Sequence, residues 1–147
     1  MKVRLLQARN PDDPVRQREQ TSFLEQLDLK PDELEILDVL EGKATFEAAT
    51  EGVDAVVIGG SGDYSITDGH FWIPSFIKTL GEIAEAGFPS FASCFGFQGM
   101  VMALGGDVQR DEAAAEVGSF DIELLNEAEN DPLFQGLPNQ FLVQQGH

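Results

Sequence analysis

The stretch Phe88–Gly106, with the sequence FPSFASCFGFQGMVMALGG, contains the pattern around which the rest of the chain is organised. Its first part, Pro89–Ala92, is a short apolar run that favours a buried strand. Its second part repeats apolar residues at the spacing of a helix, at Phe97, Met100, Val101 and Leu104, and a glycine pair then ends the pattern. The only cysteine, Cys94, therefore lies at a predicted strand-to-helix corner. Small neighbours allow a tight turn there with the side chain projecting outward, which is the geometry of a nucleophile elbow.

The rest of the chain alternates between strand and helix patterns. The expected strands before the corner are Val3–Ala8, Leu34–Leu40 and Val53–Ile58, and the expected helices are Gln17–Leu27, Thr45–Thr50 (with Thr45 as N-cap) and Pro74–Ala86. This alternation predicts an α/β fold with a mostly parallel open sheet flanked by helices. Weaker signals follow Gly106: strands at Asp107–Arg110, Val117–Leu125 and Phe141–Gln144, and a helical turn within Ala128–Phe134. No linker interrupts the chain, so residues 1–147 are expected to form a single domain.

Composition narrows the classes of partner. The chain has 147 residues, 42% of them hydrophobic, and a formal net charge of −17. Such an acidic chain is a poor ligand for nucleic acid or an anionic membrane, and a solvated acidic surface without a partner is the plain alternative. A single cysteine cannot form an internal disulfide, and the first apolar run is too short for a signal peptide, so we expect a cytoplasmic protein. Two distant histidines and no Cys/His cluster indicate neither a metal site nor a cofactor.

Two loops after successive strands carry the candidate chemistry. Gly59–Asp63, with the sequence GGSGD, follows the third expected strand, and Cys94 follows the fourth. A cysteine at a helix N-terminus is favoured as thiolate. The N–H of Phe95 and a second N–H from the glycine-rich loop would form an oxyanion hole for acyl transfer. The non-functional alternatives are that Cys94 is an inert core residue and that Gly59–Asp63 is only a turn. The loop lacks the Gly-Lys-Ser/Thr ending of a phosphate loop, so nucleotide binding is not indicated.

These residues resemble those of class I glutamine amidotransferases. Cys94–Gln98 fits their C-x-G-x-Q signature, and Gly59–Asp63 is similar to their glycine-rich oxyanion loop. Glu116–Gly118 and Asp131–Gly136 resemble later landmarks of the branch that includes the glutaminase half of GMP synthetase. The resemblance covers nearly the whole chain in the right order, and it departs at Ala92, where the family usually has glycine. It implies a flavodoxin-like amidotransferase fold that is incomplete at the C-terminus.

The resemblance also implies roles for individual residues. Cys94 would attack the side-chain amide of glutamine, form a glutamyl thioester and release ammonia. The N–H groups of Gly60 and Phe95 would stabilise the oxyanion, while Gln98 and the backbone around Gly62 would hold the substrate glutamine. A synthetase domain or subunit would accept the ammonia.

The catalytic base of that family is not found in these 147 residues. The family takes its base and orienting carboxylate from a later His-x-Glu motif, which is absent here. We interpret His70, in a loop ahead of a helix, as a surface or capping residue, and the context of His147 resembles an earlier strand of the family. The chain is therefore expected to have little or no glutaminase activity by itself. Two alternatives stay open: a γ-glutamyl peptide or amide hydrolase that uses the same cysteine, and a non-catalytic module derived from the fold.

Overall fold

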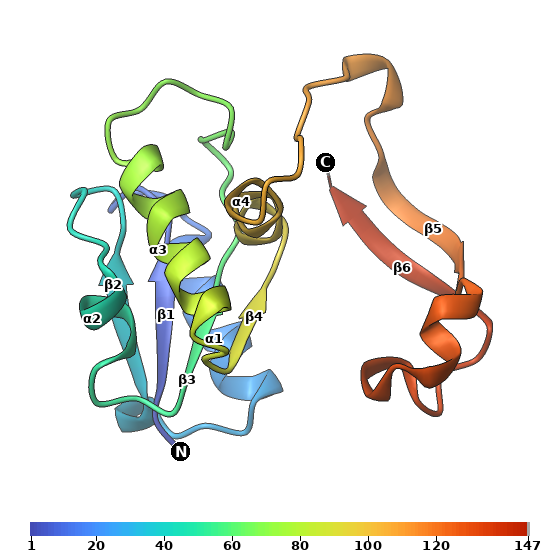
Figure 1. The fold of residues 1–147 in the computed structure, drawn as a ribbon, viewed down its shortest axis with the longest axis horizontal. Helices are drawn as coiled ribbons and strands as arrows, with labels where there is room; N and C mark the ends of the chain where they lie inside the picture. The colour runs from blue at the N-terminus through green and yellow to red at the C-terminus, as the bar shows by residue number, and fades with distance from the viewer. Residues whose placement is uncertain (147) are drawn as a thin grey trace. The chain divides into compact units, whose positions relative to one another are not determined.

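The computed structural model describes residues 1–146, with all side chains in that range except those of Glu112 and Glu129. It contains two compact units, Met1–Arg110 and the residues from Asp111 onward (Figure 1). Each unit has its own sheet, and each is described by itself. The single-domain organisation remains a prediction, and the interpretation of His147 lies outside the described residues.

The first unit is built on a four-stranded parallel sheet. Its strands are β1 (Val3–Gln7), β2 (Leu34–Asp38), β3 (Ala55–Ile58) and β4 (Ser90–Ala92). They lie in the order β2-β1-β3-β4, and every neighbouring pair is parallel. This confirms the predicted α/β class and the four strands expected before and at the Cys94 corner.

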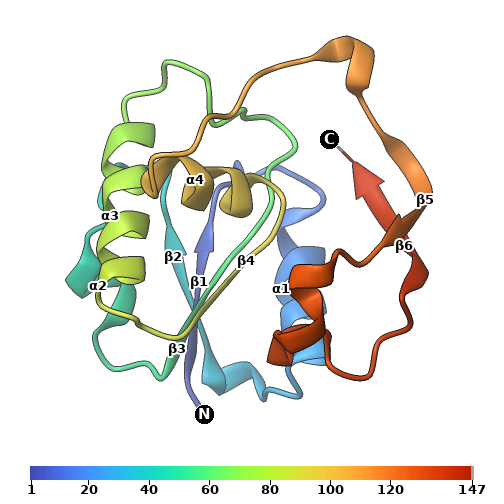
Figure 2. The same cartoon turned by 45° about the vertical axis from the view of Figure 1, so that its right-hand side comes forward.

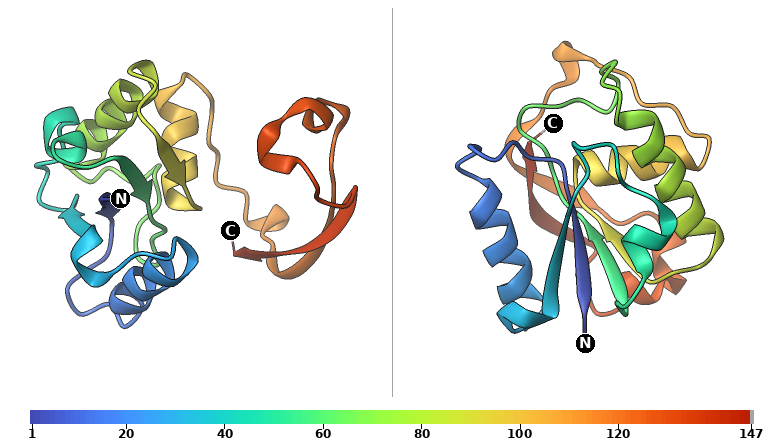
Figure 3. Two further views of the ribbon diagram at one scale, coloured as in Figure 1. Left: turned by 90° about the horizontal axis from the view of Figure 1, so that it is seen from below. Right: turned by 90° about the vertical axis from the view of Figure 1, so that its left-hand side faces the viewer.

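Helices cover both faces of this sheet. They are α1 (Arg16–Gln26), α2 (Phe46–Thr50), α3 (Ile73–Glu85) and α4 (Phe95–Ala103), with a 3-10 turn at Pro31–Glu33. Helix α1 lies on one face and the other three lie on the opposite face (Figures 2 and 3). Thr45 caps α2 by accepting a hydrogen bond from the N–H of Ala48, as predicted. No helix among residues 1–146 is both long enough and apolar enough to span a bilayer.

The alternating side chains of the strands divide into two cores. Val3, Leu5 and Val57 face α1 and pack against Phe23. The larger core, on the side of the other three helices, includes Leu6, Val56, Ile58, Phe76, Leu80, Ile83 and Phe95, all buried. Burial on both faces explains why β3 is a continuous apolar run. Strand β1 also contains Arg4 and Gln7, whose side chains donate hydrogen bonds to backbone oxygens.

The second unit contains an antiparallel hairpin. Strand β5 (Val117–Glu123) pairs with β6 (Gln140–Gly146), with Val117 opposite Gly146 and Glu123 opposite Gln140. Both strands were expected. The helical turn expected within Ala128–Phe134 is divided into 3-10 turns at Asn126–Asn130 and Pro132–Phe134, and a further 3-10 turn spans Glu112–Ala114. Proline at the start of the second turn lacks the N–H needed to continue a helix.

The strand predicted at Asp107–Arg110 is wrong. These residues have no regular secondary structure. Val108 packs against the larger core of the first unit, so its apolar side chain is partly buried without the chain joining a sheet.

Helix α4 lies very close to β3 because of one glycine. A β-carbon added to Gly96 would lie 2.4 Å from Ile58 Cγ2 and 2.9 Å from the carbonyl oxygen of Ile58. The N–H of Gly96 donates to the oxygens of Gly59 (3.1 Å) and Ser93 (2.9 Å). A side chain at this position would push the helix away from the strand, and so would move the corner that precedes the helix.

We expect Gly96→Ala to lower the free energy of unfolding by about 1–3 kcal/mol, the usual cost of overpacking a tight core. Gly81→Ala in α3 is the matched control, since its new methyl group would lie 3.6 Å from the oxygen of Ala103, an ordinary contact. Alanine also forms helices better than glycine, so the control should be neutral or stabilising by up to about 1 kcal/mol. Urea denaturation of both variants measures the difference. Equal effects would contradict the close-approach argument.

Candidate functional site

Three loops meet at one edge of the first unit. They follow the carboxyl ends of β1, β3 and β4, which lie together because these strands are parallel neighbours. The first loop carries Arg9, the second carries the glycine-rich segment Gly59–Gly62, and the third carries Cys94. This edge is where the sequence predicted the chemistry.

Cys94 occupies a strained corner between β4 and α4. Its backbone angles are φ +48° and ψ −109°, and its side chain is exposed. Positive φ is uncommon for a residue with a β-carbon, and it persists where neighbouring contacts impose it. The N–H of Ser93 donates to the carbonyl oxygen of Ile58 (2.9 Å), and the N–H of Gln98 donates to that of Cys94 (2.9 Å). The predicted strand-to-helix corner is confirmed as local structure.

Gly60 is the point on which the three loops converge. A β-carbon added there would lie 3.7 Å from Cys94 Cβ, 3.5 Å from Arg9 Nη2 and 3.9 Å from Glu19 Oε1. The structure therefore brings two of the residues expected from the sequence, Gly60 and Cys94, side by side. It adds a cation, Arg9, and a carboxylate, Glu19, that are not among the site residues expected from the sequence.

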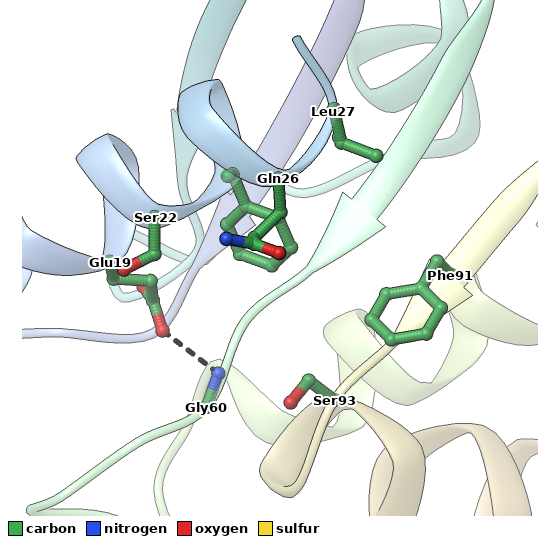
Figure 4. A pocket seen from close by; sticks show the side chains of 8 residues that line it. Glu19, Ser22, Gln26, Leu27, Gly60, Phe91 and Ser93 are labelled. Atoms are coloured by element: carbon green, nitrogen blue, oxygen red, sulfur yellow. Dashed lines mark hydrogen bonds between the residues drawn. The ribbon is translucent and has the colours of Figure 1, made fainter.

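The N–H of Gly60 donates a hydrogen bond to Glu19 Oε1 at 3.0 Å (Figure 4). Glu19 belongs to α1, and its side chain is only 8% exposed. Its Oε2 accepts a hydrogen bond from Gln7 Nε2 (2.9 Å), and its Oε1 lies 3.1 Å from Arg9 Nε. A buried carboxylate is stable where donors and a positive charge surround it in this way.

Arg9 joins Glu19 to a second carboxylate. Arg9 Nη1 donates to Asp13 Oδ2 at 2.8 Å. Burial alone would lower the pKa of Arg9, but the hydrogen bond with Asp13 and the charge of Glu19 outweigh it and raise the pKa. The pKa of Asp13 is lowered by the hydrogen bond from Arg9 and, next, by the hydrogen bond that it accepts from the N–H of Val15. The contact between Arg9 and Asp13 thus favours the charged form of both side chains.

A cavity of about 430 Å³ lies between α1 and β4. Its walls are mostly apolar, with Phe23, Leu27 and Phe91 among them, and Glu19, Gly60 and Ser93 also line it. Figure 4 shows the bond between Glu19 and Gly60 on one side of this space and Phe91 on the other. The cavity therefore borders the residues that meet at Gly60.

The other site residues expected from the sequence lie nearby in the chain. Phe95 begins α4 and is buried, with its ring stacked on Phe76 at 5.7 Å between centroids. Gln98 is half-buried in the first turn of α4. Gly62 is exposed, and a β-carbon added to it would lie 3.7 Å from Arg9 Nη1.

His70 lies in the loop before α3, as expected from the sequence. Its ring is 4.9 Å from that of Tyr64 between centroids, and its Nε2 is 3.8 Å from Asp68 Oδ2. Residues 1–146 contain no group of three or more histidine, cysteine or acidic side chains placed to hold a metal ion, counting only the side chains described.

Sequence reasoning missed Arg9 and Glu19. A signal for Arg9 was present, since it is a charged residue directly after the apolar run of β1, at the end of the strand where sites form. Glu19 had no comparable signal. It lies on α1 one turn before Phe23, 41 residues from the glycine whose amide it binds.

Comparison with known proteins gives one family. Residues 14–147 match the family model described as glutamine amidotransferase class-I. The GMP synthase [glutamine-hydrolyzing] of Lactobacillus delbrueckii subsp. bulgaricus is 42% identical over 66 residues, and that of Tropheryma whipplei is 38% identical over 66 residues. Each match covers 45% of this chain but only 12% of the relative.

Solved structures share the fold. A glutamine amidotransferase from Thermotoga maritima aligns with a TM-score of 0.73 at 21% identity, over all of this chain and 61% of its own. One from Methylobacillus flagellatus aligns with a TM-score of 0.66 at 17% identity, over all of this chain and 54% of its own. The chain thus spans less than two thirds of these related structures.

The charge pair of Arg9 and Asp13 makes a prediction about acid stability. A carboxyl group whose pKa is lowered by folding stabilises the fold above its unfolded-state pKa of about 4, and this stabilisation is lost as the pH falls through the folded-state value. Asp13→Asn keeps an oxygen to accept from Val15 but removes the charge. We expect it to be less stable than Asp12→Asn at pH 7, with the two variants converging at about pH 2.

Thermal denaturation of the two variants across this pH range measures the effect. Asp12 is the exposed neighbour, so Asp12→Asn matches the change in net charge. A stability difference that is the same at pH 7 and pH 2 would show that the carboxylate of Asp13 is not what Arg9 stabilises.

Proposed function

The chain belongs to the class-I glutamine amidotransferase family, and from this premise we propose that Cys94 is the nucleophile of a glutamine-hydrolysing reaction. The observation that best supports the proposal is the geometry of the corner at Cys94. An exposed thiol at φ +48° stands at the N-terminus of α4, and its β-carbon lies 3.7 Å from the place where Gly60 lacks one. The absent side chain at Gly60 leaves space beside the sulfur for a carbonyl group.

The proposed reaction begins with attack by Cys94 Sγ on the side-chain carbonyl carbon of glutamine. A C–S bond forms, and the π electrons of the carbonyl move to its oxygen. The N–H groups of Gly60 and Phe95 are proposed to stabilise that oxyanion. When the intermediate collapses, the C–N bond breaks and the nitrogen leaves as ammonia after taking a proton. Water then hydrolyses the glutamyl thioester to glutamate and restores the thiol.

The remaining parts of the proposal concern the substrate and the base. Gln98 and the backbone around Gly62 are proposed to hold the glutamine, and a synthetase domain or subunit to receive the ammonia. The names of the similar GMP synthases support this assignment over a γ-glutamyl hydrolase. The proton transfers need a base, which we propose comes from residues outside these 147.

Selective alkylation of Cys94 tests the nucleophile. A chloromethyl ketone with the amino-acid head of L-glutamine should form a C–S bond with Cys94 and release chloride. We expect it to react about tenfold or more faster than its D-enantiomer, because a site that holds the substrate raises the effective concentration of the reacting groups. Intact-mass spectrometry with time gives the rates, and Cys94→Ser is the blank. Equal rates for the two enantiomers would favour a non-catalytic module.

Ammonia release tests the proposed source of the base. The 147-residue polypeptide should release ammonia from glutamine no faster than its Cys94→Ser variant, since a cysteine nucleophile needs a positioned base. A coupled glutamate or ammonia assay measures this. Turnover that depends on Cys94 would contradict the expectation and would make His70 or His147 the candidate base.

A further inference from the structure

We propose that Glu19 covers the N–H of Gly60 in the free protein and competes with the substrate oxyanion for this donor. The inference rests on the proposed function, because it gives Gly60 the role assigned there. It adds a residue from α1 that the reaction described above does not use, and it makes withdrawal of the Glu19 carboxylate a condition for forming the thioester.

The contact has the length of a hydrogen bond from an oxyanion donor. Glu19 Oε1 lies 3.0 Å from the nitrogen of Gly60. An oxyanion donor acts over about 2.7–3.1 Å, and a carboxylate oxygen carries the same kind of negative charge as the oxygen of a tetrahedral intermediate. A single N–H points in one direction, so the N–H of Gly60 cannot donate fully to Glu19 Oε1 and to a substrate oxyanion at the same time. The carboxylate therefore stands in for the anion that the amide is proposed to bind.

The backbone of the glycine-rich loop allows this approach. A β-carbon added to Gly59 would lie 2.7 Å from Glu19 Cδ and from Glu19 Oε1. Glycine at position 59 is thus required for the carboxylate to reach the neighbouring amide. Gly59 and Gly60 therefore have different roles in the loop: Gly59 leaves room for the carboxylate, and Gly60 supplies the N–H.

The same contacts show how the carboxylate can leave. Arg9 keeps a second carboxylate partner in Asp13, so loss of Glu19 does not leave its positive charge unpaired. Glu19 also lines the cavity of about 430 Å³ between α1 and β4, which gives the side chain a place to turn into. The anionic oxygen of the intermediate would then replace the carboxylate at the N–H of Gly60.

The experiment compares two reagents on the same thiol. The glutamine-like chloromethyl ketone places negative charge on a carbonyl oxygen as sulfur adds, so its rate depends on the oxyanion donor. Iodoacetamide alkylates by direct displacement and depends on the thiolate alone. The ratio of the two rates therefore reports the donor and cancels any change in the thiol that follows from altering a nearby charge.

Glu19→Ala should raise this ratio by about tenfold, a fraction of the roughly 100-fold that a lost oxyanion donor costs. Glu19→Gln keeps an acceptor oxygen without the charge and should give an intermediate rise, which covers the case in which the alanine variant misfolds. Glu25→Ala, on the exposed side of the same helix, matches the change in charge and should leave the ratio unchanged. An unchanged or lower ratio in both Glu19 variants would overturn the inference.

A second measurement separates this failure from failure of the proposed function. The amide proton of Gly60 should resonate downfield in the parent protein and move upfield in Glu19→Ala, because a charge-assisted hydrogen bond is lost. An unchanged chemical shift would mean that the contact is absent; this would contradict the inference about Glu19 and leave the proposed function intact. Movement without any preference for the L-glutamine reagent over its D-enantiomer in any variant would mean that the proposed function fails, and the inference falls with it.

Discussion

The close contact of α4 with β3 is the constraint on which the candidate site depends. Because Gly96 has no side chain, the helix begins directly against Ile58, and its N–H bonds to the oxygens of Gly59 and Ser93. These contacts restrict the backbone angles of Cys94, the residue just before the helix, and it takes φ +48° as a result. Strain at the thiol is thus held in place by packing two residues away. The glycine-rich loop is bound to the same helix start, so the two loops keep a fixed relation.

A second constraint is electrostatic. The chain carries a formal net charge of −17, yet a guanidinium that is only 11% exposed lies where the strand ends meet. Arg9 is retained there because Asp13 and Glu19 supply two carboxylates within ion-pair distance, and Gln7 satisfies the remaining oxygen of Glu19. Removing Arg9 would leave both carboxylates without their cation, which is more damaging than the ion pairs themselves are stabilising. The cluster therefore behaves as one unit that fixes the loop after β1 to the loop after β3.

Features encoded by local sequence were predictable, and features made by distant residues were not. The four parallel strands and their helices follow from the periodicity of apolar residues, and the Cys94 corner follows from a strand pattern that changes to a helix pattern. The strand predicted at Asp107–Arg110 is wrong because a single partly buried residue, Val108, gives the same short apolar signal as a strand. The bond between Glu19 and Gly60 joins residues 41 positions apart, and no periodicity marks it. Arg9 could have been found from its position after β1, since charged residues at strand ends form sites in parallel sheets.

The effect of Glu19 on the loop and on the reaction depends on which acceptor replaces its carboxylate at the N–H of Gly60. A backbone N–H that is shielded from water is stabilised by an acceptor, so the half-buried amide of Gly60 benefits from a partner in the absence of substrate. Glu19 provides that partner and holds the loop in the shape that places Gly60 beside Cys94. An oxyanion that forms on the substrate is also an acceptor for this N–H. It becomes available as negative charge develops on the substrate oxygen. The same hydrogen bond can thus keep the empty site ordered and yield to the intermediate, because the loop has a partner in both states.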